Sequence, residues 1–175
     1  MADSDDPVEQ DIGASPLLAA ERLVLSRLQA GQFDLDALHA ISNIYRAAAG
    51  VRRRAEREVL ADHQLSWGGF TILWVLWVWG EKETADLAAE CDLAKGTLTG
   101  MLNTLERQGF VQRSRLDTDR RRVSVVLTDA GRATIEQTYP AFNDFEAKML
   151  VGLDADDQRE LARLLRVVTN NANSD

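Results

Sequence analysis

A chain of 175 residues with one cysteine and two histidines has room for one compact domain with helical extensions, but it offers neither an internal disulfide nor a zinc-type ligand set. Its longest apolar run, at 70–79, is about half as long as a membrane-spanning helix, and its acidic start lacks the charge of a secretory signal, so we expect a cytoplasmic protein without membrane contact or cofactor. The net charge is -8, yet residues 95–132 carry a net +4 against -12 elsewhere, which is compatible with a polyanionic partner.

Helical periodicity dominates the first third of the chain. Residues 1–14 are acidic and poor in large apolar groups, and we expect them to form a disordered tail. Apolar residues recur at helical spacing over 16–30, which predicts a short helix that the Gly-Gln pair at 31–32 ends. From Asp34 the same spacing continues for about 25 residues, a length that usually serves an interface. The segment 15–62 is therefore predicted to be helical, with its long helix at an interface.

Three further helices are predicted in the middle of the chain. The first, over 67–79, is apolar on every side and is therefore expected to be buried, with Ser66 as its N-cap. The second is expected to begin at Thr84, whose hydroxyl can cap it. The third extends over 95–108 and ends at Gly109.

The helix predicted over 95–108 has two different sides. Leucine and methionine fill one side, whereas the other carries small residues and hydrogen-bonding groups. A helix fits the major groove of duplex DNA, and small residues in its N-terminal half allow close approach to base edges. Asn103 suits an adenine or a phosphate, and Arg107 suits the phosphate backbone. The predicted DNA-binding residues of this helix are Lys95, Gly96, Thr97, Thr99, Gly100, Asn103 and Arg107.

After Gly109 the apolar period falls to two residues, which predicts a two-stranded hairpin with a polar tip. Charged residues at the tip cannot enter a core. Arginines on a hairpin beside a helix in the major groove can reach the adjacent minor groove. We therefore add the tip arginines to the predicted DNA contacts, with Arg121 as the strongest candidate: Arg120, Arg121 and Arg122.

Two more helices are predicted to close the chain. The first begins near Thr128 and ends near Leu150, and Pro140 is expected to kink or interrupt it. The second begins at Asp154, with acids in its first turn and a stripe of leucine and valine. The predicted fold is mainly α. A winged helix-turn-helix module over 63–131, with one small β-hairpin wing, is flanked by helices over 15–62 and 132–175.

Four sequence segments together carry a resemblance to a known family. They are LSWGGF from 65, TADLAAECDLAKGTLTGMLNTLERQGFVQR over 84–113, DRR over 119–121 and LTDAG over 127–131. From about Leu65 to Gly131 the chain resembles the MarR family of bacterial winged helix-turn-helix regulators. The resemblance implies that 95–108 enters the major groove and that Asp119 and Arg121 organise a wing at the minor groove. It further implies dimerisation helices over 15–62 and 132–175, which build a homodimer, and a small phenolic or other aromatic effector.

These observations predict a ligand-responsive transcription regulator that binds double-stranded DNA. A repressor acting on a near-palindromic operator is the expected form, and its effector pocket would use His63, Trp67 and Trp74. No nucleophile motif, phosphate loop or paired-acid motif stands out, so an enzyme is not expected. Two alternatives stay open. One is a winged-helix module that binds protein instead of DNA, which the acidic total charge favours; the other is a redox sensor that uses the Cys91 thiol.

Overall fold

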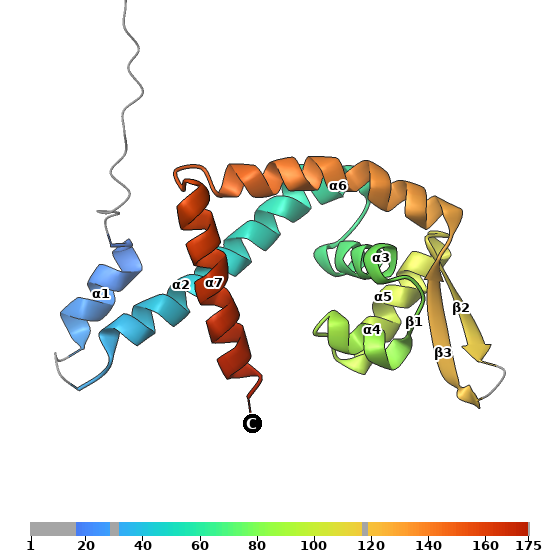
Figure 1. The fold of residues 1–175 in the computed structure, drawn as a ribbon, viewed down its shortest axis with the longest axis horizontal. Coiled ribbons are helices and arrows are strands. Elements are labelled where there is room, and N and C mark those ends of the chain that lie inside the picture. The colour runs from blue at the N-terminus through green and yellow to red at the C-terminus, as the bar shows by residue number, and fades with distance from the viewer. Residues whose placement is uncertain (1–16, 29–31, 117–118, 175) are drawn as a thin grey trace, which may run out of the picture. The chain divides into compact units, whose positions relative to one another are not determined.

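The computed structural model describes residues 17–28, 32–116 and 119–174, without the side chains of residues 116–121 (Figure 1). The predicted tail over 1–14 lies outside the described residues and stays a prediction. Contacts divide the chain into two units. One comprises Ala47–Glu146, and the other lies within Met1–Arg46 and Ala147–Asp175.

A buried carboxylate joins the first two helices, α1 (Ala19–Arg27) and α2 (Leu35–Ala55). Glu21 is only 4% exposed. It accepts hydrogen bonds from the Leu18 backbone N–H at 2.6 Å and from Asn43 Nδ2 at 2.7 Å. These bonds stabilise the charged form and lower the pKa of Glu21. The side chain therefore both caps α1 and fastens it to α2.

The helical segment that begins with α2 changes pitch after Ala55. Asp34 Oδ1 caps its start by accepting from the Ala37 N–H at 2.9 Å. After Ala55 the chain continues as a π-helical segment, Glu56–Leu60, and a 3-10 turn, Ala61–His63. The long helix predicted from Asp34 is thus present, but its last turns are not α-helical.

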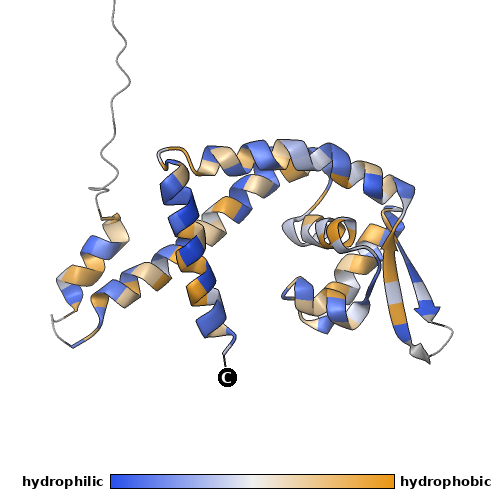
Figure 2. Ribbon diagram, viewed as in Figure 1, coloured by the Kyte–Doolittle hydropathy of each residue, from blue (hydrophilic) through white to orange (hydrophobic). Residues whose placement is uncertain are grey.

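The C-terminal helix α7 (Ala155–Ala172) leaves its apolar residues uncovered. Asp154 Oδ1 caps it by accepting from the N–H groups of Asp156 and Asp157, at 2.8 and 2.9 Å. None of its residues is buried in the part of the chain that the structure describes. Figure 2 shows hydrophobic and hydrophilic residues mixed on its surface. The exposed apolar residues are Leu161, Leu164, Leu165, Val167 and Val168.

Helix α3 (Trp67–Trp79) is central to the core of the larger unit. Ser66 caps it as predicted, with its Oγ accepting from the Gly69 N–H at 3.1 Å. Its first ten residues are mostly buried, whereas Val78 and Trp79 are each 49% exposed. The prediction that the whole helix is buried therefore holds only up to about Leu76.

A short sheet strand precedes the next helix, α4 (Thr84–Glu90). Lys82–Glu83 form strand β1, and Glu83 occupies the cap position of α4 without a side-chain capping bond. Thr84 is the first helical residue, so the prediction that it caps the helix is wrong by one position. The reason is that pairing with the sheet holds the chain extended as far as Glu83.

Strands β2 (Val111–Leu116) and β3 (Asp119–Leu127) confirm the predicted hairpin. Strand β1 adds to it, giving an antiparallel sheet in the order β1-β3-β2. Lys82 pairs with Val125, and Val111 pairs with Leu127. The register shifts between Arg115 and Leu116, near the tip.

Helix α6 (Asp129–Met149) is continuous through Pro140, so of the two effects predicted for this proline, a kink or an interruption, the interruption is absent. Residues on both sides of the proline are buried, namely Ile135, Thr138, Phe142 and Phe145. Their packing offsets the single backbone hydrogen bond that proline removes. Within the described segments, none of the helices combines the length and apolar character needed to span a bilayer.

The junction between the wing and α6 is tightly packed. Thr128 Oγ1 donates to the Gly109 carbonyl at 2.6 Å and accepts from the Gly131 N–H at 3.0 Å. A Cβ atom added to Gly131 would lie 1.9 Å from the carbonyl oxygen of Phe110. The LTDAG segment therefore requires glycine at 131 for steric reasons.

Candidate nucleic-acid interface

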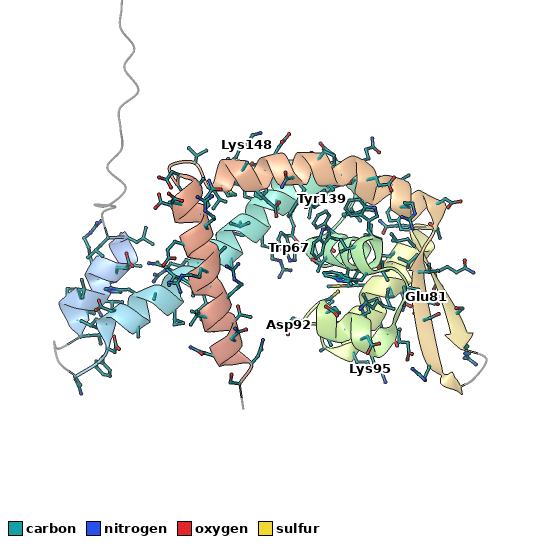
Figure 3. The ribbon with its side chains drawn as sticks, viewed as in Figure 1. Trp67, Glu81, Asp92, Lys95, Tyr139 and Lys148 are labelled. Atoms are coloured by element: carbon teal, nitrogen blue, oxygen red, sulfur yellow. The ribbon has the colours of Figure 1, made fainter. Side chains whose placement is uncertain are left out.

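Helix α5 (Lys95–Arg107) has one buried and one exposed side, as predicted. Leu98, Leu102 and Leu105 are at most 2% exposed. The chain then turns at Gly109, which has a φ of 77° and donates its N–H to the Glu106 carbonyl at 3.0 Å. Every predicted DNA-binding residue of this helix is exposed, beginning with Lys95 at its N-terminus (Figure 3).

Two exposed glycines flatten this side of α5. A Cβ atom added to Gly96 or Gly100 would meet no atom of the described chain within 4 Å. Each glycine destabilises a helix by about 1 kcal/mol relative to alanine. Because internal packing does not require them, they make sense as positions where a partner approaches the helix backbone closely.

Threonine hydroxyls lie beside these glycines. Thr99 Oγ1 donates to the Lys95 carbonyl at 2.8 Å, and Thr104 Oγ1 donates to the Gly100 carbonyl at 3.4 Å. Both hydroxyls retain capacity to accept a hydrogen bond. Thr104 is exposed on the same face and was not among the predicted site residues. Its spacing of four residues from Gly100 is the sequence signal that could have identified it.

An arginine of strand β2 connects the wing to α5. Arg113 Nη2 donates to Asn103 Oδ1 at 2.8 Å, and Arg113 Nε donates to Glu106 Oε2 at 3.1 Å. The Arg113 guanidinium lowers the pKa of Glu106, chiefly through its hydrogen bonding to the Glu106 carboxylate. Arg113 uses one of the two acceptor positions of Asn103 Oδ1, so the amide can still offer both this oxygen and its NH₂ group to a partner. A bidentate contact with adenine would need both groups.

The base of the wing is held by a second arginine. Arg122 Nε donates to Glu83 Oε2 at 2.7 Å, and its Nη2 bonds the other carboxylate oxygen. This pair ties β3 to β1, although the Arg122 side chain remains about half exposed. Asp119, Arg120 and Arg121 belong to β3 by their backbone, but their side chains lie outside the description. Their contact with DNA stays a prediction.

Two of the three predicted effector residues share a cleft. Trp67 and Trp74 line it from α3, with Tyr139 and Phe142 opposite them on α6, and its volume is about 230 Å³. His63 ends the 3-10 turn and is not among the described residues that line this cleft. Among the described residues, no group of His, Cys, Asp and Glu is placed to hold a metal ion.

The Cys91 thiol lies at the C-terminal end of α4 and is partly buried. Burial, with a smaller contribution from the Glu90 charge, raises the pKa of Cys91 to about 11. The thiol is therefore neutral near physiological pH, whereas a redox sensor needs a thiolate. This environment disfavours the thiol-sensor alternative.

Iodoacetamide is expected to modify Cys91 slowly at about pH 7 and faster as the pH approaches 11, because only the thiolate reacts. Intact-mass measurement across this pH range checks the rate, with glutathione in a parallel reaction as the unperturbed control. A midpoint for Cys91 at or below that of glutathione would contradict the structure.

The arrangement of α4, α5 and the β2–β3 wing defines a winged helix-turn-helix DNA-binding protein. The model of the MarR family matches residues 65–123. The HTH-type transcriptional regulator YwaE of Bacillus subtilis is 37% identical over 147 residues, covering 84% of this chain and 86% of YwaE. The chain belongs to the MarR family of transcriptional regulators. This membership confirms the predicted family and fold, and the expectation that the protein is not an enzyme.

Solved structures agree with this fold. A mutant of Escherichia coli MarR, complexed with operator DNA, is 26% identical, with a TM-score of 0.68 over 73% of this chain and 91% of MarR. BpsR of Bordetella bronchiseptica, whose DNA binding is regulated by 6-hydroxynicotinic acid, has a TM-score of 0.68 at 23% identity. The match covers 74% of this chain and 98% of BpsR, and it shows similarity of the fold alone.

Proposed function

We propose that the protein is a homodimeric repressor in the cytoplasm that binds a near-palindromic operator and is released by a small aromatic effector. The exposed face of α5 carries the DNA-binding part of this proposal. Gly96 and Gly100 flatten it without any internal packing need, and hydroxyl and amide groups flank them. Such a surface suits base edges in the major groove.

The uncovered apolar residues of α7 support the dimer. Five leucine and valine residues of this helix are exposed, and Leu23 and Leu25 of α1 are exposed as well. Apolar surface of this kind marks an interaction site, and a second copy is the commonest partner. In a twofold dimer the two α5 helices would enter successive major grooves about 34 Å apart, on an operator of roughly 16–20 base pairs.

The aromatic cleft supports the effector. Its walls are aromatic, as is usual for small-molecule sites. BpsR shows that a protein of this fold responds to an aromatic compound. The effector would release DNA by binding more tightly to a dimer whose helix spacing does not match the operator.

Selection from random DNA duplexes at two salt concentrations tests the proposal. The full chain is expected to enrich a twofold-symmetric site, with affinity that falls steeply as salt rises. Sedimentation of the free protein should show a dimer. Failure to enrich any sequence, with negligible binding at low salt, would support a protein-binding module instead.

Arg121→Ala is expected to weaken binding to every DNA sequence and to flatten the salt dependence by about one unit of slope per half-site, because each protomer of the dimer loses one phosphate or groove contact. Affinities measured at several salt concentrations give the slope. Arg54→Ala removes the same charge from α2 and should leave the slope unchanged. An unchanged slope for Arg121→Ala would remove the wing from the proposed interface.

A further inference from the structure

The cleft between α3 and α6 has walls made almost entirely of aromatic rings. The Phe70 and Phe142 rings lie 4.3 Å apart, and the Trp67 and Phe142 rings lie 5.9 Å apart, measured between centroids. Trp67 and Tyr139 belong to opposite sides of this cleft (Figure 3). The volume of about 230 Å³ suits a ligand of one or two rings.

Of the described residues that line this cleft, a single one is charged, and it is acidic. Glu146 of α6 lies at the cleft, and Asn143 Nδ2 donates to its Oε2 at 3.0 Å. Among the described residues, no lysine, arginine or histidine lines the cleft. The faces of aromatic rings also present negative potential. An anionic ligand would therefore meet repulsion here, without a base to compensate for it.

We propose that the cleft binds a lipophilic organic cation, such as an aromatic quaternary ammonium or protonated amine, and not an aromatic acid. This inference rests on the proposed effector site and names the ligand class for it. The tryptophan faces stabilise the cationic head by cation–π attraction, and the Glu146 carboxylate adds a direct charge interaction. The remaining rings bury the apolar part of the ligand.

Three probes of similar size separate charge from shape. Benzyltrimethylammonium carries the cation, neopentylbenzene is its uncharged carbon counterpart, and salicylate carries a negative charge. Titration of the full chain, followed by tryptophan fluorescence and calorimetry, should show the cation binding at least about tenfold more tightly than the uncharged probe. Salicylate should bind more weakly than either.

Glu146→Gln is expected to weaken binding of the cation by about fivefold and to leave the uncharged probe unaffected. The glutamine keeps a side-chain oxygen that can accept from Asn143. Asp144→Asn is the matched control, because it removes the same charge from an exposed residue of α6 that does not line the cleft. It should change neither affinity.

Operator binding measured alongside distinguishes this inference from the effector proposal. The inference is supported if the cation binds and Glu146→Gln weakens that binding, whether or not the operator is released. If the bound cation does not release the operator, the effector proposal fails. Release of DNA by salicylate or the uncharged probe in preference to the cation overturns the inference and leaves the effector proposal standing. Equal cation affinity in Glu146→Gln and the parent also overturns it, and no binding by any probe overturns both.

Discussion

Gly100→Leu is expected to weaken operator binding by about a hundredfold or more while the fold stays intact. Gly100 lies on the exposed face of α5, and space is open around an added Cβ within the described chain. A leucine there would hold the helix away from the base edges, and each lost base contact is worth about 1–3 kcal/mol. A dimer would lose such contacts in both half-sites, which accounts for the size of the effect.

Fluorescence anisotropy with the selected operator measures this loss, and thermal unfolding checks the fold. Leucine favours a helix over glycine, so the stability of the variant should equal or exceed that of the parent. Gly50→Leu is the control, since Gly50 of α2 also has open space around it within the described chain. Because α2 belongs to the segment predicted to dimerise, sedimentation must first show that this variant forms the same dimer as the parent. Unchanged operator affinity in Gly100→Leu would show that this face of α5 does not meet the bases.

Gly131→Ala is expected to destabilise the folded protein by about 2–3 kcal/mol, as overpacking in a tight junction commonly does. The added Cβ would lie 1.9 Å from the Phe110 carbonyl oxygen. Because that atom belongs to the backbone, no side-chain rotation relieves the clash. The end of β2 or the start of α6 must move instead, and Thr128 would lose the geometry of its two hydrogen bonds.

Urea denaturation at one fixed protein concentration measures this change, since stability of a dimer depends on concentration. Gly96→Ala serves as the control, because its Cβ meets nothing within 4 Å in the described chain and should stabilise α5 by up to about 1 kcal/mol. Equal midpoints for Gly131→Ala and the parent would mean that the junction yields more easily than its geometry indicates.

Periodicity predicted most of the helices because an amphipathic helix shows its apolar side as a repeat of three to four residues. The cap at Ser66 and the stop at Gly109 were visible in the sequence for the same local reasons. Features set by distant partners were not visible. Strand β1 exists because Lys82–Glu83 meets β3 across the sheet, and α6 continues through Pro140 because its neighbours pack into the core.

The exposed face of α5 was predictable for the same reason as its buried face. Arg113 was missed as part of the site because its role depends on Asn103 and Glu106 lying across from β2, which spacing along the chain does not show. The cleft illustrates the same limit. Trp67 and Trp74 were predictable as a pair on one helix, whereas Tyr139, Phe142 and Glu146 join them only through packing of α6.

The guanidinium of Arg113 has a consequence for how an operator is chosen. By binding both Asn103 and Glu106, it holds the wing and α5 in one relative geometry. A rigid DNA-binding surface loses little conformational entropy on binding, and it also adapts little to a duplex whose shape does not fit it. The DNA must then deform to fit the protein. The affinity should therefore differ between operators with stiff and flexible base steps, even at steps that no side chain contacts.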